Sequence, residues 1–316
     1  TCALPISIQT QYVRCDVGAN LSQFEGTLTA IGTGGNFRLM SNVTDMQKGR
    51  LIVGAGTTVS HMQSGGGSEV AATLKIGALS STATDAVMGG TSTYQVGYLG
   101  ENTTFRGLLK CSRLQKMGTG KLTLTTVGST APITVSAGTL EVSSTSATAL
   151  TTGAVTVQKG GTITGTATLQ TLTMASGSTL RCQLTASGNT RLTVKGNVRH
   201  TNDTILVSIP ASRRLQVGDE LTVLNVSGTH SGTFVVKAEA EDGMSYEFDD
   251  STLLTDGTLR VKSISTSVIA LPADDAVVTV VTTDGMVVRR NVPFSKALEG
   301  LPRGTYIVGG VKMMKR

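Results

Sequence analysis

Tryptophan is absent from this chain, and aromatic residues make up only 3% of its 316 residues. A compact globular core normally takes much of its buried area from aromatic side chains. Charged residues are also scarce, at 15% against about 25% in a typical soluble domain. Thr and Ser take their place on the surface, and because Thr is β-branched this favours exposed sheet over exposed helix. The composition therefore predicts an all-β protein with a narrow, aliphatic core.

Other absences exclude several classes of function. No apolar run reaches the ~18 residues of a membrane helix, so we expect no membrane-spanning segment. The net charge of +6 comes from scattered Lys and Arg without interleaved aromatic residues, so we expect no nucleic-acid partner. The cysteines lie far apart and form no C-x-x-C pair, so we interpret them as small buried hydrophobes. They are Cys15, Cys111 and Cys182, whereas Cys2 belongs to the first six residues, which we interpret separately.

What the chain does contain is a recurring triplet of apolar, polar and apolar residues, followed by a turn with Gly. Such alternation is typical of short β-strands. The triplets recur at intervals near 20 residues, which is typical of a parallel β-helix whose coils stack with the same face inward. Stacked hairpins are the alternative, but Asn-Gly and Asp-Gly turns are rare before residue 240. We predict one solenoid over residues 18–235, with inward columns formed by Leu122, Leu124, Val135, Leu140, Val155, Ile163 and Leu172.

One segment carries a more specific pattern. "FRGLLKCSRLQKMGTGKLTLTTVGSTAPITVSAGTLEV" (105–142) closely resembles the autotransporter-associated β-strand repeat of bacterial surface passenger domains, although 129–132 replaces its usual Y-x-G. Residues 215–234 resemble the end of such passengers. The resemblance implies a right-handed parallel β-helix, used as a rigid stalk or display surface. We assign residues 7–262 to it, with closing coils from about 200.

The last fifty residues change to hairpin spacing, with valines on both sides of Asp284-Gly285. Their pattern resembles the C-terminal sorting domain of the type IX secretion pathway of Bacteroidetes. The resemblance implies that residues 266–316 fold as a separate small antiparallel β-sandwich, which directs export through the secretion machinery. "SISTSVIALPADD" (263–275) would be the linker. The residues that carry the candidate sorting signal are Pro302, Gly304, Tyr306, Gly310, Lys312 and Lys315.

The first six residues, "TCALPI", read as the translation of a common sequencing-adapter oligonucleotide. We therefore interpret residues 1–6 as an artefact and expect the chain to be a C-terminal fragment of a longer protein.

Residues that could carry chemistry are few. The three histidines, His61, His200 and His230, lie far apart in the sequence and form no metal-ligand spacing. We interpret His61 and His230 as exposed turn residues, and the acidic pairs Asp249-Asp250 and Asp274-Asp275 as loop and linker residues. The sequence predicts no catalytic residue, no metal ligand and no cofactor.

Two hypotheses for the function remain. The first is a non-catalytic stalk or adhesin segment, located outside the cell or on the outer-membrane surface, with cell-surface glycans or a host surface as partners. The alternative is the C-terminal part of a β-helical, pectate-lyase-like enzyme that degrades polysaccharides, with its active site in a missing N-terminal part.

Overall fold

The structure is a computed structural model that describes residues 6–9, 14–32, 36–65, 67–266 and 272–315. The chain divides into two units, Thr1–Ser265 and Thr266–Arg316. Residues 1–5, which include Cys2 and most of the segment interpreted as an adapter remnant, lie outside the described residues. So do residues 267–271 of the expected linker.

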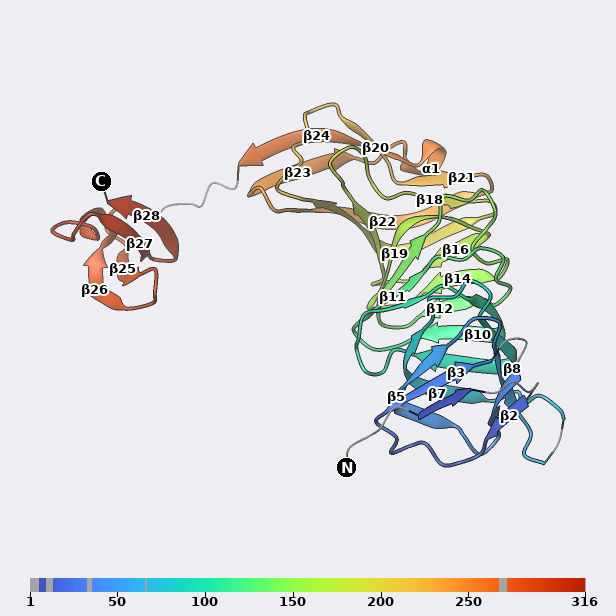
Figure 1. The fold of residues 1–316 in the computed structure, drawn as a ribbon. Helices are drawn as coiled ribbons and strands as arrows, with labels where there is room; N and C mark the ends of the chain where they lie inside the picture. The colour runs from blue at the N-terminus through green and yellow to red at the C-terminus, as the bar shows by residue number, and fades with distance from the viewer. Residues whose placement is uncertain (1–5, 10–13, 33–35, 66, 267–271, 316) are drawn as a thin grey trace. The chain divides into compact units, whose positions relative to one another are not determined.

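The first unit is a parallel β-helix, which confirms the predicted fold class (Figure 1). A strand typically pairs in parallel with the strand one coil earlier and the strand one coil later. For example, β12 (Ile133–Val135) lies between β10 (Leu108–Lys116) and β14 (Ala154–Val157). These parallel pairings exclude the stacked hairpins that were the alternative for this region.

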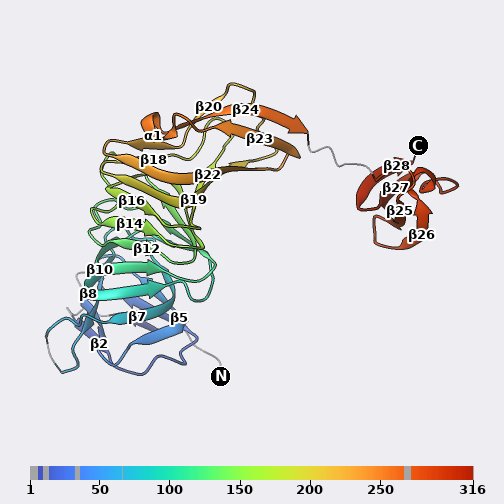
Figure 2. The same ribbon diagram turned by 180° about the vertical axis from the view of Figure 1, so that it is seen from behind.

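Long strands turn a corner of the coil, because their two halves have different partners. β8 (Val87–Val96) pairs with β6 (Thr58–Met62) at its start and with β7 (Thr73–Ser80) at its end. Figure 2 shows β8, β10, β12, β14 and β16 (Thr171–Met174) one above another along one side of the stack. The other strands of the stack are β1 (Ile6–Gln9), β2 (Arg14–Val17), β3 (Thr27–Ile31), β4 (Asn36–Met40), β5 (Asp45–Val53), β9 (Thr103–Phe105), β11 (Lys121–Leu124), β13 (Gly138–Ser143), β15 (Gly161–Leu169), β17 (Thr179–Gln183), β18 (Leu192–Val194), β19 (Val198–Ile209), β21 (Leu224–Val226) and β22 (His230–Ala240).

Inward side chains form apolar columns along the stack. Leu122 pairs with Leu140, and Leu140 pairs in turn with Ile163. All the residues predicted to face inward are at most 2% exposed, so that prediction is confirmed. Because parallel strands lie about 4.8 Å apart, aliphatic side chains in successive coils touch and fill this core with few aromatic residues.

One inward position holds a lysine. Lys116 lies in register with Val135 of the next coil, and its side chain is fully buried. Its Nζ donates to the carbonyl oxygens of Met117 at 2.6 Å, Gly118 at 3.0 Å and Ala137 at 3.3 Å. Burial disfavours the charged form and lowers the pKa of Lys116 to about 8. The ammonium group thus binds backbone carbonyls of two adjacent coils, between Val96 and Val135 of the same column.

Two corners require glycine. Gly165 has φ +110° and Gly232 has φ +115°, a region that other residues rarely adopt. A Cβ atom would also clash with the carbonyl oxygen of Val142 at Gly165, and with that of His200 at Gly232. The chain can therefore bend at these corners only because the side chain is missing.

The outer face carries a ladder of polar side chains across four coils. Gln95 Nε2 donates to Gln115 Oε1 at 2.8 Å, and Gln115 Nε2 donates to Ser136 Oγ at 2.8 Å. Ser136 Oγ in turn donates to Gln158 Oε1 at 2.7 Å. Stacked amides of this kind join parallel strands through their side chains as well as their backbones.

The stack ends where the pairing changes from parallel to antiparallel. β20 (Glu220–Thr222), β24 (Thr258–Thr266) and β23 (Met244–Asp249) form a separate three-stranded sheet, and the short α1 (Leu253–Asp256) precedes β24. Leu221, Leu253 and Leu259 are buried in the same core as the coils. This sheet therefore closes the aliphatic core after the last parallel strand.

The second unit is a four-stranded antiparallel sheet in the order β26–β25–β27–β28. The sequence predicts a sandwich; the described residues form one sheet, packed against the 3₁₀ helix η1 (Phe294–Lys296) and the segment after it. Val280, Tyr306 and Ala297 belong to its small core, with Leu298 packed against them. The strands are β25 (Val277–Thr282), β26 (Val287–Pro293), β27 (Gly304–Val308) and β28 (Val311–Lys315).

Candidate functional site

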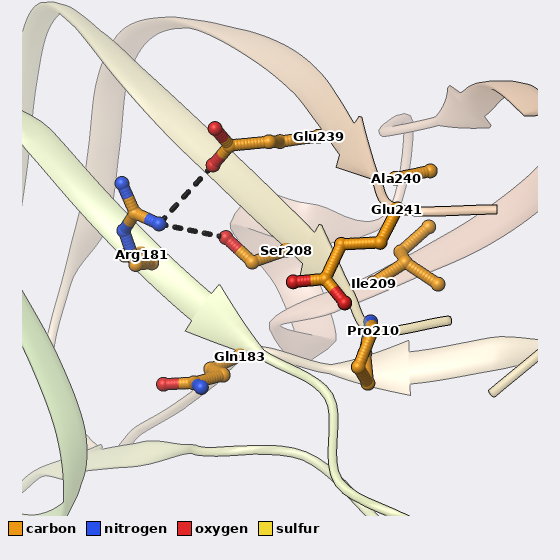
Figure 3. A pocket seen from close by; sticks show the side chains of 8 residues that line it. All are labelled: Arg181, Gln183, Ser208, Ile209, Pro210, Glu239, Ala240 and Glu241. Carbon is orange, nitrogen blue, oxygen red and sulfur yellow. Dashed lines mark hydrogen bonds and ion pairs between the residues drawn. The ribbon is translucent and has the colours of Figure 1, made fainter. Parts of the chain in front are cut away.

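A groove crosses the outer face of β17, β19 and β22, near the end of the parallel stack (Figure 3). Its volume is about 260 Å³. We call it the arginine groove, and its polar lining consists of Arg181, Gln183, Ser208, Glu239 and Glu241.

Strand alternation places these side chains on the outside. Cys182, between Arg181 and Gln183, is buried in the core. Ala240, between Glu239 and Glu241, packs against the same core. Because neighbouring residues of a strand point to opposite faces, their polar neighbours must face the solvent. Parallel pairing of three coils then brings the polar residues side by side.

Arg181 joins all three strands of the groove. Its Nη1 donates to Ser208 Oγ at 3.1 Å and to Glu239 Oε2 at 3.1 Å, as the dashed lines in Figure 3 mark. Glu241 Oε2 accepts the backbone N–H of Ala211 at 3.1 Å. The side chains of Arg181 and Glu239 are 37% and 62% exposed, and an ion pair this open contributes less than about 1 kcal/mol to stability. Its main effect is to orient the guanidinium group.

The groove offers both kinds of hydrogen-bonding group. Arg181 supplies planar N–H donors, Glu239 and Glu241 supply carboxylate acceptors, and the amide of Gln183 supplies both. Pro210 adds an apolar side to the lining. Such a set suits a ligand with neighbouring hydroxyl groups, which donate to carboxylates and accept from guanidinium N–H groups. The sequence does not reveal this site, because its residues are far apart along the chain and become neighbours only when three successive coils stack.

The structure brings together two of the histidines that the sequence leaves apart. The Nε2 atoms of His200 and His230 lie 3.1 Å apart, and the rings are tilted by 41°. On the other side of the His200 ring, Nδ1 lies 2.9 Å from Asp203 Oδ2. His200 and Asp203 are buried. The interpretation of His230 as an exposed turn residue is wrong, since it begins β22 and is only partly exposed.

A bulge in β19 creates this arrangement. The pairing with β22 shifts between Thr201 and Asp203, and Asn202 between them has φ +46°. The extra residue reverses the alternation, so that Asp203 points inward like His200. A hydrophobic pattern cannot reveal such an insertion, which is why the sequence placed no carboxylate beside a histidine.

His61 also differs from its interpretation as a turn residue. It lies on β6 and is completely buried, with Nδ1 2.9 Å from Ser92 Oγ. Burial lowers its pKa. We therefore interpret His61 as a core residue paired with the hydroxyl group of Ser92.

The buried cysteines fit their interpretation as small hydrophobes. Cys111 and Cys182 lie in the core, and burial raises the pKa values of their thiols to about 12 and about 11. Cys15 is partly exposed at the other end of the stack. Because a buried thiol with a raised pKa has little thiolate at neutral pH, a packing role suits Cys111 and Cys182.

The candidate sorting residues lie along β27 and β28 and beside them. Tyr306 is buried, and its hydroxyl group donates to the carbonyl oxygen of Pro302 at 3.0 Å. Gly304 pairs with Lys315, and Lys312 on β28 is exposed. Gly310 lies in the turn between the strands with φ +85°. Tyr306 and Gly310 therefore shape the unit, whereas Lys312 is displayed on its surface.

No family model matches the chain, and no curated protein matches it. Within the described ranges, no three or more His, Cys, Asp and Glu side chains converge as a metal site. Among the helices of the same residues, none has the length and hydrophobicity to cross a membrane.

Proposed function

We propose that the first unit is a non-catalytic β-helical stalk of a bacterial surface protein, and that its arginine groove binds a glycan. The observation that carries the proposal is an open groove lined by Arg181, Gln183, Glu239 and Glu241 on a continuous parallel stack. The ladder of polar side chains from Gln95 to Gln158 and the apolar columns favour a rigid rod. The resemblance of residues 105–142 to the passenger repeat also supports a display role.

A glycan array with the whole chain tests the groove. We expect Arg181→Gln and Glu239→Gln each to reduce binding of the best glycan at least tenfold, because each removes a hydrogen-bonding group of the groove. Glu141→Gln is the matched control, since Glu141 pairs with Lys121 on the same outward face of an earlier coil. Equal losses in all three variants, or no glycan bound by the unaltered chain, would exclude the groove as a glycan site.

The same glycans distinguish the stalk from the enzyme alternative. Incubation of the bound polysaccharide with the chain should leave its length distribution unchanged by size-exclusion chromatography. Shortened products that disappear in Glu239→Gln would overturn the non-catalytic proposal and support a polysaccharide-degrading enzyme.

We further propose that the second unit directs export to the cell surface by the type IX pathway. Its separate core and the exposed Lys312 on β28 support a role as an independent signal. In a bacterium with this pathway, Lys312→Glu should reduce the amount of chain at the surface. Lys296→Glu on η1, also exposed, is the charge-matched control. Unchanged surface display in Lys312→Glu would contradict a signalling role for this strand.

A further inference from the structure

Two inward columns of the stack hold histidines in its last coils. His200 pairs with Met174, which pairs with Val157. His230 pairs with Val198, which pairs in turn with Leu172. Aliphatic side chains at these two positions would continue the core, whereas burying imidazole groups costs desolvation free energy. Their presence therefore calls for an explanation beyond packing.

The contacts around His200 fix which of its nitrogens is available. The Asp203 carboxylate accepts a hydrogen bond from Nδ1–H of His200 at 2.9 Å, and it also accepts the backbone N–H of Thr201 at 3.2 Å. With the hydrogen on Nδ1, neutral His200 has its free electron pair on Nε2. That atom faces Nε2 of His230 at 3.1 Å. A buried carboxylate thus orients one imidazole so that its free nitrogen meets the second.

This geometry is close to that of two ligands on one metal ion. Two nitrogens at Zn–N distances of about 2.0–2.1 Å in a tetrahedron lie about 3.3 Å apart. The observed separation of His200 and His230 differs from this value by only a few tenths of an ångström. A carboxylate behind the ligand histidine, as Asp203 stands here, is a usual outer partner in such sites.

His230 also makes the pair accessible from one side. His230 borders a cavity of about 230 Å³, whose lining includes Asn225, Ser227 and Asp256. One carboxylate oxygen of Asp256 accepts the backbone N–H of Thr258 at 3.0 Å. The cavity gives an ion a route in and room for water molecules that would complete its coordination.

We propose that His200 and His230 form an open binding site for a divalent transition-metal ion of the Zn²⁺ or Cu²⁺ class, with Asp203 as the positioning residue. The ion takes the place of the hydrogen between the two Nε2 atoms, as His230 changes to its Nδ1–H tautomer, and water molecules supply the remaining ligands.

Titration of the metal-stripped whole chain with Zn²⁺ tests the site by calorimetry. Cys2→Ser and Cys15→Ser should be present throughout, so that these two thiols do not compete for the ion. We expect one ion per chain and at least a tenfold loss of affinity in His230→Gln. Asp203→Asn should weaken binding about 10–100-fold, as loss of an outer partner does. His61→Gln is the matched control, because its histidine is buried in another part of the stack, and it should bind normally.

A second readout needs no substitution at the site. Diethyl pyrocarbonate should modify partly exposed His230, and Zn²⁺ should protect it, as peptide mass spectrometry would show. Absence of saturable one-to-one binding together with absence of protection would overturn the proposal, leaving the pair as a hydrogen-bonded relay. Binding that persists unchanged in His230→Gln would overturn it as well, even if the ion binds elsewhere.

Discussion

Lys116 places an ammonium group among aliphatic side chains, and this makes stability depend on pH. Its pKa is about 8 in the folded chain, against about 10.4 when unfolded. Between these values the unfolded state binds more protons, so the free energy of unfolding contributed by Lys116 rises with pH. The buried thiols of Cys111 and Cys182 have raised pKa values and act in the opposite direction above pH 9.

The effect of Lys116 is therefore measured as a difference between two proteins. Urea unfolding of the unaltered chain and of Lys116→Met, at several values from pH 7 to 10, cancels the contributions of the thiols. We expect the stability of the unaltered chain relative to the variant to increase by about 1–3 kcal/mol over this range. A constant difference would mean that the carbonyl groups around Nζ keep the pKa of Lys116 near its ordinary value.

A single charge should be intolerable in the inward columns. Leu140 is fully buried between Leu122 and Ile163, so Leu140→Asp would bury a carboxylate without a partner. We expect a loss of more than about 3 kcal/mol in urea unfolding. Thr139→Asp, one residue earlier on the outer face, is the control and should cost less than about 1 kcal/mol. Similar losses in both variants would contradict the assigned inward face.

At the scale of the element, two different requirements favour glycine at the corners: a positive φ, and close approach to the backbone of the neighbouring coil. Gly165 combines positive φ with a close backbone contact, whereas Gly160 has φ +79° and open space around it. We expect Gly165→Ala to cost more than about 2 kcal/mol and Gly160→Ala about 1 kcal/mol. Urea midpoints of the two variants measure the difference. Equal costs would show that the chain can shift away from Val142 without penalty.

The sequence predicts strands better than it predicts their neighbours across coils. Triplets such as Leu122-Thr123-Leu124 reveal strands and inward faces, because alternation is a local property. The groove, in contrast, depends on which residues of successive coils become neighbours, and the coils differ in length. Arg181 pairs with Leu206, 25 residues later, but with Thr164, only 17 residues earlier. Because the loops between strands vary in length, the sequence does not reveal which outward-facing residues become neighbours in successive coils. The bulge at Asn202, one inserted residue, is equally invisible in a period-two pattern.

At the scale of the whole molecule, the two units should unfold separately. Their apolar clusters share no residues, so calorimetry of the whole chain should show two transitions. Tyr306→Ala removes a buried ring and its hydrogen bond to Pro302 in the small core. We expect it to lower only the transition of the second unit. A matching downward shift of the larger transition would show that the units unfold together.

The register of the stack also makes each coil a unit of length. Gly138 and Gly161 occupy equivalent places in successive coils, as do Leu140 and Ile163. Removal of residues 138–160 would therefore place Ile163 directly beside Leu122 and leave every remaining inward residue inward. The rod would be shorter by one strand spacing, about 4.8 Å, with its cross-section unchanged. Duplication or loss of such a segment in a gene could thus adjust the reach of the rod in fixed steps, without a new core having to evolve.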